Sequence, residues 1–362
     1  MKVALVYDRV NKWGGAERVL LALHELFPDA PLFTSVHHPK TSSWANVFAI
    51  KPSFLQNIPF AASRHEFLPL FMPVAFESFS FDAYDLVISV TSEAAKGIIT
   101  KPGTVHICYC LTPTRYLWSG YETYFSNKLL KFLTQPFVTA LRKWDKAAAH
   151  RPDKIIAISD EVRKRVKKYY GREAVVVYPP VMLPLTKAQQ VEKKQTGDYF
   201  LIVSRLSRFT KYKRIDLAIE AFNELKLPLK IIGEGSWKKK LKSKAGQNIE
   251  FLGKVSDEEL STYYQNSKAL IFPGIEDFGL TMVESQQFGK PVIAFRGGGA
   301  LEIIKEGKTG LFFDTQTKKA LVKAVLYFQK NTFDPKVAQK QAEQFSKAEF
   351  KKHFLTVVKQ MF

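Results

Sequence analysis

Two glutamates in the second half of the chain stand where carboxylates can bind a ligand. Glu276 follows a short apolar stretch, 269–272, and a Pro-Gly turn, and Glu284 comes eight positions later within a helical pattern. Ligands of open α/β sheets bind at the carboxyl ends of strands, and carboxylates accept hydrogen bonds from hydroxyl groups. Backbone N–H groups at the start of this helix would face a phosphate or sugar oxygen, namely those of Phe278, Gly279, Leu280 and Thr281. A pair of solvated acids at the helix flank is the other interpretation.

Basic residues follow the first predicted strand of the second half. Arg205, Lys211 and Lys213 come just after an apolar stretch that ends at Val203. Cations at the carboxyl end of a strand suit a diphosphate, and they stabilise it as a leaving group. Ordinary surface charge is the competing interpretation, because 54 Lys and Arg against 34 Asp and Glu give a formal net charge of +20. This surplus also favours anionic partners, such as nucleic acid, acidic lipid or phosphorylated ligands.

Glycines between the first predicted strand and the first predicted helix form another candidate loop. Gly14 and Gly15 allow backbone N–H groups and a helix N-terminus to approach an anion closely. A tight turn is the alternative. The loop lacks the G-x-G-x-x-G pattern, so the fingerprint of dinucleotide binding is missing.

Motifs for metal and nucleophile chemistry are missing from the sequence. It contains no H-E-x-x-H, no P-loop and no D-x-D pair, and none of its seven histidines stands in a recognisable nucleophile elbow. The two cysteines, Cys108 and Cys110, make a poor disulfide and a poor zinc site, and are interpreted as half-buried strand residues of a reduced, cytoplasmic protein. We therefore expect no metal, no cofactor and, for any phosphate chemistry, a metal-independent mechanism.

Short apolar stretches alternate with longer helical ones, and this alternation predicts an α/β fold with parallel sheets. After Pro179–Pro180 a stretch rich in Lys, Gln, Thr and Gly predicts a linker. We expect a first domain over 1–180, a linker over 181–198, a second domain over 199–344, and a C-terminal helix over 345–362 within a helical pattern that starts at 341. Strands are predicted at 2–7, 86–90, 105–109, 154–158, 175–178, 199–203, 229–232, 249–252, 269–272 and 292–295, and helices include 215–225 and 257–264.

Neither a signal peptide nor a membrane-spanning segment is predicted. Five apolar residues precede Asp8, which is too short for the apolar region of a signal peptide. No apolar run reaches the ~18 residues that a transmembrane helix needs.

Several blocks recur along the chain in a familiar order and spacing: 14–17 (GGAE), 204–206 (SRL), 213–216 (KRID), 233–235 (GEG), 253–257 (GKVSD), 273–284 and 289–294 (GKPVIA). Together they resemble the retaining, GT-B-fold glycosyltransferases of family 4, the group 1 glycosyltransferases, over essentially the whole chain. The segments at 108–110, 112–118, 144–145 and 178–181 resemble a mannosyltransferase-like subgroup.

This resemblance implies an architecture and an activity. The fold would consist of two Rossmann-like domains that face each other across a cleft, with a C-terminal helix that crosses back to the first domain. The first domain would bind the acceptor and the second the nucleotide sugar. The enzyme would move a hexose to a lipid-linked or polysaccharide acceptor in bacterial polysaccharide biosynthesis, with retention and without a metal. Mannose from GDP-mannose is favoured, and UDP-hexoses come next.

The resemblance also implies roles for single residues. Glu276 would contact the sugar and Glu284 the ribose hydroxyls. Arg205 and Lys213 would hold the diphosphate, and Lys213 is preferred over Lys211 because it directly precedes the Arg-Ile-Asp-Leu segment. The amides of 278–281 would receive sugar and phosphate oxygens. The remaining contacts would come from Gly233, Lys254 and Val255 around the base and from Gly14 and Gly15 over the phosphate.

One position departs from the family pattern. Where the family segment reads His-Thr-Pro, this chain has Leu111 before Thr112. A leucine side chain neither donates nor accepts a hydrogen bond, so slower turnover with retained donor binding is expected. A non-catalytic or impaired sugar-nucleotide binder is therefore the main alternative function.

Two other protein classes share part of the pattern. An NAD-dependent oxidoreductase also has two α/β domains, but the glycine fingerprint and its acidic partner are missing. A nucleic-acid-binding protein fits the charge, but no recognised binding module is present, and nucleic acid is not expected as a partner.

Basic and apolar residues are mixed in three segments of the first domain, at 128–133, 142–144 and 163–168. Such segments suit docking on an anionic membrane, so we expect a cytoplasmic protein that is peripheral on the inner face of the cell membrane. Solvated helix faces are the alternative.

Overall fold

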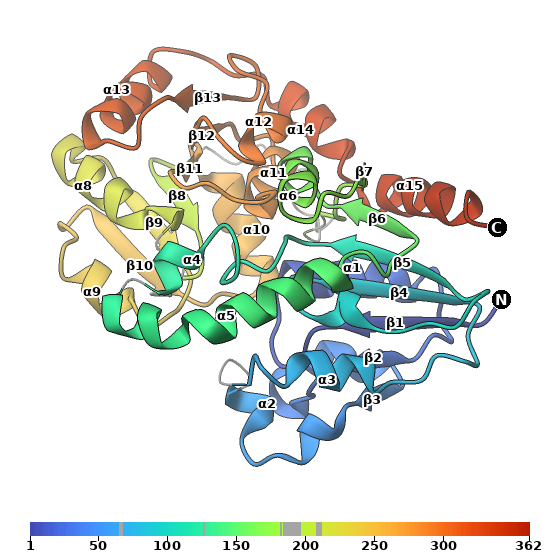
Figure 1. Cartoon of the computed structure of the whole chain (residues 1–362). Coiled ribbons are helices and arrows are strands. Elements are labelled where there is room, and N and C mark those ends of the chain that lie inside the picture. The colour runs from blue at the N-terminus through green and yellow to red at the C-terminus, as the bar shows by residue number, and fades with distance from the viewer. Residues whose placement is uncertain (65–67, 126, 182, 184–196, 208–211) are drawn as a thin grey trace. The chain divides into compact units, whose positions relative to one another are not determined.

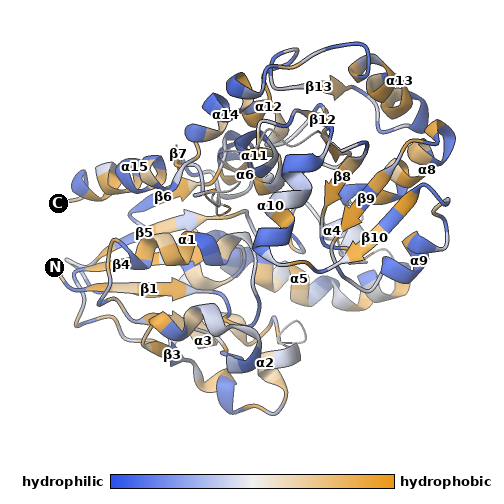
Figure 2. Ribbon diagram, turned by 180° about the vertical axis from the view of Figure 1, so that it is seen from behind, coloured by the Kyte–Doolittle hydropathy of each residue, from blue (hydrophilic) through white to orange (hydrophobic). Residues whose placement is uncertain are grey.

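Strands with almost no exposed side chains form the centre of each half of the chain. Every residue of β1 (Val3–Tyr7) and of β4 (Leu86–Thr91) is buried. β1 is wholly apolar, and β4 is apolar apart from Ser89 and Thr91; such buried strands are typical of parallel sheets that are covered on both faces. Figure 2 shows the strands as predominantly hydrophobic, whereas the helices around them carry hydrophobic and hydrophilic residues.

The computed structural model describes residues 1–64, 68–125, 127–181, 183, 197–207 and 212–362 (Figure 1). The chain divides into two compact units, of which the first contains Met1–Pro180 and Phe350–Phe362 and the second Val181–Glu349. Most of the predicted linker, 181–198, and Lys211 lie outside the described residues.

The first unit contains a parallel sheet in the order β3-β2-β1-β4-β5-β6-β7. The strand that comes first in the chain lies inside the sheet, and the strand order reverses between β1 and β4. Its other strands are β2 (Leu32–Thr34), β3 (Ile50–Pro52), β5 (Val105–Cys110), β6 (Lys154–Ala157) and β7 (Val175–Val176). Its main helices are α1 (Gly15–His24), α2 (Ala61–Arg64), α3 (Met72–Glu77), α4 (Tyr121–Tyr124), α5 (Lys128–Ala148) and α6 (Asp160–Tyr170).

The second unit repeats this plan with the order β10-β9-β8-β11-β12-β13, and its order reverses between β8 and β11. The strands are β8 (Phe200–Val203), β9 (Leu229–Ile232), β10 (Ile249–Gly253), β11 (Leu270–Phe272), β12 (Val292–Phe295) and β13 (Gly310–Phe313). The helices are α8 (Ile215–Leu225), α9 (Lys238–Lys242), α10 (Asp257–Asn266), α11 (Leu280–Gln287), α12 (Ala300–Ile303), α13 (Lys318–Phe328) and α14 (Pro335–Glu343). Side chains of α8 and α13 share one apolar core with β8 and β9.

The end of the chain returns to the first unit. In α15 (Lys347–Lys359), Phe350 and Phe354 pack on the Tyr109 ring of β5, with centroids 5.8 and 6.4 Å apart. Phe345 belongs to the second unit, where its ring packs against Phe278. The helical pattern predicted from 341 onward is therefore wrong as one continuous helix, because α14 and α15 are separated by the segment that carries Phe345.

The two cysteines of β5 are more deeply buried than expected. Cys108 and Cys110 are free and only 1% and 2% exposed. Burial raises the pKa of the Cys108 thiol to about 11, so this thiol is protonated near neutral pH and is a poor nucleophile. In the described part of the chain, none of the helices has the length and hydrophobicity needed to span a bilayer.

Candidate functional site

The reversal of strand order in the second unit brings two site loops together. Ser204 directly follows β8, and Pro273 directly follows β11, at the point where parallel α/β sheets hold ligands. A pocket lies there, and its polar lining includes Ser204, Lys213 and Glu276. Two segments that are far apart in the sequence therefore share one site at the carboxyl edge of the sheet.

Lys213 and Glu276 form an ion pair in this pocket. Their side chains are 15% and 18% exposed, so both remain within reach of a ligand. Gly274 permits the approach, because a Cβ at this position would lie 2.5 Å from the Lys213 Cα. The backbone N–H of Ile275 also donates to the Tyr212 carbonyl at 3.4 Å. Close backbone packing thus places a cation and a carboxylate side by side.

Arg205 lies on the next segment, whose backbone is held by the loop after β9. The Leu206 N–H donates to the Glu234 carbonyl at 2.9 Å, and the Trp237 N–H donates to the Leu206 carbonyl at 2.7 Å. A Cβ on Gly233 would lie 1.8 Å from the Ser204 carbonyl oxygen, so only glycine fits there. The structure thus shows Gly233 as a packing residue beneath the Arg205 segment.

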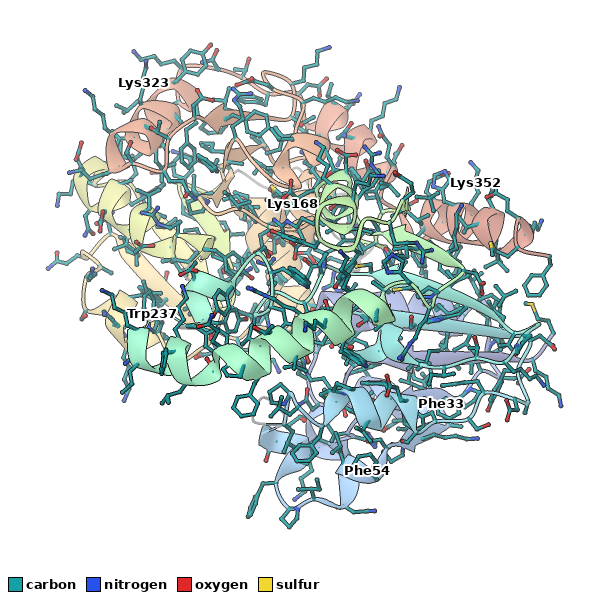
Figure 3. All side chains as sticks on the ribbon, in the orientation of Figure 1. Phe33, Phe54, Lys168, Trp237, Lys323 and Lys352 are labelled. Atoms are coloured by element: carbon teal, nitrogen blue, oxygen red, sulfur yellow. The ribbon has the colours of Figure 1, made fainter. Side chains whose placement is uncertain are left out.

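The Arg205 side chain is exposed and lines a neighbouring pocket with Asp216 and Trp237. Trp237, labelled in Figure 3, directly precedes α9. The structure therefore brings Lys213 and Glu276 into contact, whereas Arg205 lines the adjacent pocket.

The N-terminus of α11 follows the Glu276 loop. Gly279 caps this helix in a left-handed conformation, with φ of 101°, and Leu280 and Thr281 are its first residues. The Phe278 side chain is 2% exposed and packs on Phe345, so only its backbone can face a ligand. Glu284, about one turn into α11, is 3% exposed and accepts a hydrogen bond from the Tyr264 hydroxyl at 2.8 Å.

The glycine segment after β12 was not singled out from the sequence. The Gly299 N–H donates to the Glu276 carbonyl at 3.0 Å, and a Cβ on Gly299 would lie 2.1 Å from the Phe278 carbonyl oxygen. Three consecutive glycines, 297–299, one residue after a predicted strand were the available signal. This segment supports the backbone that carries Glu276.

Lys254 and Val255 follow β10, which is an edge strand two positions away from β8. Lys254 is exposed, and Val255 is partly buried. The next residue, Ser256, caps α10 in a reciprocal arrangement with Glu259, with N–H to oxygen distances of 2.8 and 3.2 Å. The pair lies at the same edge of the sheet as the Glu276 loop, because carboxyl ends of parallel strands share one edge.

Gly14 and Gly15 belong to the first unit, whereas the other predicted site residues belong to the second. Gly15 is the first residue of α1, and Gly14 precedes it. A Cβ on Gly14 would lie 3.1 Å from the Glu17 carboxylate, which is buried and accepts a hydrogen bond from the Tyr7 hydroxyl at 2.7 Å. Glycine thus keeps the start of this helix close to a buried carboxylate.

A buried ion pair holds the loop that follows Leu111. The Asp145 carboxylate pairs with Lys96 at 2.5 Å and accepts hydrogen bonds from Thr114, Trp118 and Tyr170 at 2.7 to 2.8 Å. Burial alone lowers the pKa of Lys96, but the charge of Asp145 outweighs it, so the pKa lies above its usual value. This network joins four segments of the first unit.

Replacing Lys96 with methionine is expected to destabilise the first unit by about 3–5 kcal/mol, because it leaves the Asp145 carboxylate buried without its cation. The matched control is Lys164→Met, whose partner Asp160 lies at 2.9 Å in an exposed pair and whose loss costs at most about 1 kcal/mol. Urea unfolding followed by tryptophan fluorescence measures both, since Trp118 belongs to the network. Equal urea midpoints for Lys96→Met and Lys164→Met would show that the buried ion pair contributes no more to stability than the exposed one.

Metal ligands do not cluster in the described residues: no group of three His, Cys, Asp or Glu side chains is arranged to hold an ion there. The polar groups around Lys213 and Glu276 are suited to an anionic, hydroxyl-rich ligand.

Comparison with known proteins places this site in a family. Residues 186–351 match the family of glycosyl transferases group 1. The chain carries a group 1 glycosyltransferase domain. The chain is 28% identical over 211 residues to the uncharacterized glycosyltransferase MJ1178 of Methanocaldococcus jannaschii, covering 57% of this chain and 58% of that protein. It is 27% identical over 213 residues to the GDP-mannose-dependent alpha-(1-6)-phosphatidylinositol monomannoside mannosyltransferase of Mycolicibacterium smegmatis, covering 52% and 54%.

The matched segments thus span little more than half the length of these two relatives. Over the whole chain, the fold resembles that of Anabaena Alr3699/HepE, solved in complex with UDP, with a TM-score of 0.73, 18% identity, and 99% and 100% of the two chains covered. The two parallel Rossmann-like sheets are those of the GT-B glycosyltransferase fold, as expected from the sequence. All site residues of the second unit lie within the segment that matches the family.

Proposed function

We propose that this protein is a retaining, metal-independent hexosyltransferase that uses a nucleotide-sugar donor. The observation that carries the proposal is the Lys213–Glu276 pair at the point where the strand order of the second sheet reverses. A cation beside a carboxylate suits a ligand that joins a diphosphate to a polyhydroxylated sugar. The N-terminus of α11, with Gly279, Leu280 and Thr281, adds backbone N–H groups to the same edge.

In the proposed reaction, the bond between the anomeric carbon and the diphosphate oxygen breaks, and the acceptor oxygen forms its bond on the same face of the sugar. The electron pair stays on the departing diphosphate, which takes up the proton of the acceptor hydroxyl. Lys213 and Arg205 offset the charge that develops on the diphosphate, and Glu276 orients the sugar through its hydroxyls. Glu284 holds the ribose, and the segments at Gly233 and at Lys254–Val255 border the base.

Mannose from GDP-mannose is the proposed donor. The mannosyltransferase of Mycolicibacterium smegmatis is named as GDP-mannose-dependent, which supports this choice. HepE, the structural neighbour, was solved with UDP and with UDP-glucose, so a UDP-hexose is the second candidate. The proposed acceptor is a lipid-linked or polysaccharide intermediate, bound by the first unit beside Gly14 and Gly15. The proposed location is the cytoplasm, at the inner face of the cell membrane.

Calorimetric titration of the chain with GDP-mannose, UDP-glucose and NAD, followed by detection of released nucleoside diphosphate, tests this proposal. Saturable binding of GDP-mannose with turnover in the presence of acceptor supports it. If only UDP-glucose binds and is turned over, the proposed donor is wrong, but the proposed transfer reaction is supported. Sugar-nucleotide binding without turnover would identify a non-catalytic binder, and binding of NAD alone would overturn the proposal.

Leu111 is proposed to limit the rate without preventing donor binding. It follows β5, its N–H donates to the Thr91 carbonyl at 2.8 Å, and its apolar side chain offers nothing to a sugar hydroxyl. Leu111→His is expected to raise the transfer rate by about tenfold, the value of one added hydrogen bond in the transition state, while the donor dissociation constant changes little. Initial rates at saturating donor measure it, with Leu111→Asn as a second polar variant. An unchanged or slower rate for Leu111→His would reject this role.

A further inference from the structure

The first half of α5 exposes a row of large apolar side chains to solvent. Leu129, Phe132, Leu133 and Phe137 are 68%, 73%, 58% and 54% exposed. Their spacing of three and four residues places them on one side of the helix. We call these four residues the α5 apolar face.

Most of the α5 apolar face lies away from the side of the helix that packs on the first unit. Val138, Leu141, Asp145 and Ala148 are between 0% and 8% exposed, and all four lie from the helix middle onward. Phe137 lies four residues before Leu141 and continues this buried row toward the start of the helix, whereas Leu129 and Phe132 lie on a different side. The core therefore does not account for the four exposed residues, and isolated exposed residues would not recur at helical spacing.

The charge around this face is positive. α5 contains five basic residues, of which Lys128, Lys143 and Lys146 are exposed. Lys131 pairs with Glu122 at 2.7 Å. The one carboxylate within α5, that of Asp145, is buried and bound by Lys96. A partner of this helix thus meets apolar side chains flanked by lysines.

The other basic helix of the first unit, α6, differs in this respect. Arg163 and Lys164 pair with Asp160 at 2.5 and 2.9 Å, Arg165 pairs with Glu161 at 2.8 Å, and Lys167 pairs with Glu173. Lys168, labelled in Figure 3, ends this basic run. Within α6, most of the positive charge is therefore neutralised locally, and no large exposed apolar residue accompanies it in the described chain.

Further apolar side chains are exposed in the same unit at the start of α2 and around α3. Phe60, Phe71 and Val74 are 76%, 51% and 55% exposed. α3 is joined to α5, because the Trp144 indole N–H donates to the Glu77 carboxylate at 2.7 Å. In Figures 1 and 2, α2 and α3 lie below α5 in both views. The exposed apolar residues of the first unit thus extend beyond one helix.

We propose that the α5 apolar face enters the surface of an anionic lipid membrane, with Lys128 and Lys143 at the level of the lipid headgroups. The apolar side chains leave water, and the long lysine side chains keep their charges among anionic headgroups. The net charge of +20 favours this partner over a second copy of the same basic chain, which would be repelled. The inference rests on the proposed function, since it brings the enzyme to a lipid-linked acceptor.

Vesicle co-sedimentation tests the inference with the full chain and without sugar nucleotide. The vesicles contain phosphatidylcholine alone or with about one third phosphatidylglycerol. Phe132→Ser/Phe137→Ser is expected to weaken binding to the anionic vesicles by at least about tenfold. The matched control, Leu326→Ser/Tyr327→Ser, removes two exposed apolar residues of α13 in the second unit and is expected to bind like the original chain.

A second pair of variants separates charge at this face from charge in general. Lys128→Gln/Lys143→Gln is expected to weaken binding to anionic vesicles by several-fold, about tenfold at most. Lys239→Gln/Lys240→Gln on α9 removes the same charge elsewhere and is expected to change it little. Equal loss in both pairs, or equal binding to both lipid compositions, would overturn the inference.

The same variants distinguish the other occupants of this surface. If Phe132→Ser/Phe137→Ser abolishes a dimer in sedimentation while vesicle binding is unchanged, the surface joins two copies and the inference is overturned. Donor titration is measured separately, so absent vesicle binding with intact turnover rejects the membrane surface alone. Vesicle binding with no donor binding rejects the proposed function alone.

Discussion

Lys213→Ala is expected to lower the rate of sugar transfer by about 10²–10³-fold, the size of effect seen when one preorganised stabilising group is removed from an active site. Lys213 is partly buried beside Glu276, in a pocket formed by the ends of β8 and β11. A cation in such surroundings interacts with a developing negative charge more strongly than one in water does. Arg205→Ala, on the adjacent segment, is expected to reduce transfer as well.

The control is Lys318→Ala, in the same unit. Lys318 pairs with Glu224 at 2.7 Å, and both side chains are half-exposed, so its loss removes the same charge from a solvated surface. Initial rates of nucleoside diphosphate release measure both variants, together with the donor dissociation constant. Near-native turnover of Lys213→Ala would show that this lysine does not stabilise the leaving group.

Elements with strong local signals could be predicted closely from the sequence. Predicted ranges 215–225, 229–232 and 292–295 coincide with α8, β9 and β12. The strands β2, β3 and β13 were missed, because runs of three or four residues carry little periodicity and are defined by the neighbouring strand. The break between α14 and α15 had a signal that was not used: Asp334-Pro335 and Ser346-x-x-Glu349 are patterns typical of helix starts. In the structure, Ser346 accepts the Glu349 N–H at 3.3 Å.

The candidate site could be predicted as a set of residues but not as an arrangement. Sequence order placed Lys213 and Glu276 after different strands, and their ion pair depends on how closely Gly274 packs on the Lys213 backbone. The ion pair joins positions 63 residues apart, so it leaves no local pattern in the sequence. For the same reason, the support of the Glu276 loop by Gly299 was missed.

Charge runs were the least informative feature of the sequence. The basic segments at 128–133 and 163–168 looked alike, but their surroundings differ. Asp160 and Glu161 lie within one helical turn of their basic partners, so the partial neutralisation of the α6 charge follows from local spacing. The exposure of Phe132 follows from which side of α5 packs on the core, and only the structure gives it.

Glu276→Gln is expected to change sugar transfer and nucleoside diphosphate binding in opposite directions, whereas Lys213→Ala changes both in the same direction. Transfer should fall by about 100-fold, because an amide replaces the carboxylate that orients the sugar hydroxyls. Binding of the nucleoside diphosphate alone should become tighter, by about fivefold, which corresponds to about 1 kcal/mol. The reason is that Lys213 is paired with the Glu276 carboxylate, and a diphosphate competes with this carboxylate for the lysine.

Titration with GDP and UDP, alongside initial rates of transfer, measures the two effects of Glu276→Gln. Glu250→Gln is the matched control, since Glu250 pairs with Lys230 at 3.2 Å between β9 and β10, away from the pocket. This control should leave both quantities unchanged. If Glu276→Gln weakened diphosphate binding, the carboxylate would position Lys213 for the diphosphate. It would then not compete with the diphosphate for this lysine. A merely structural role of Glu276 would lower binding and transfer together, whereas opposite changes require that Lys213 contact the phosphate and Glu276 the sugar.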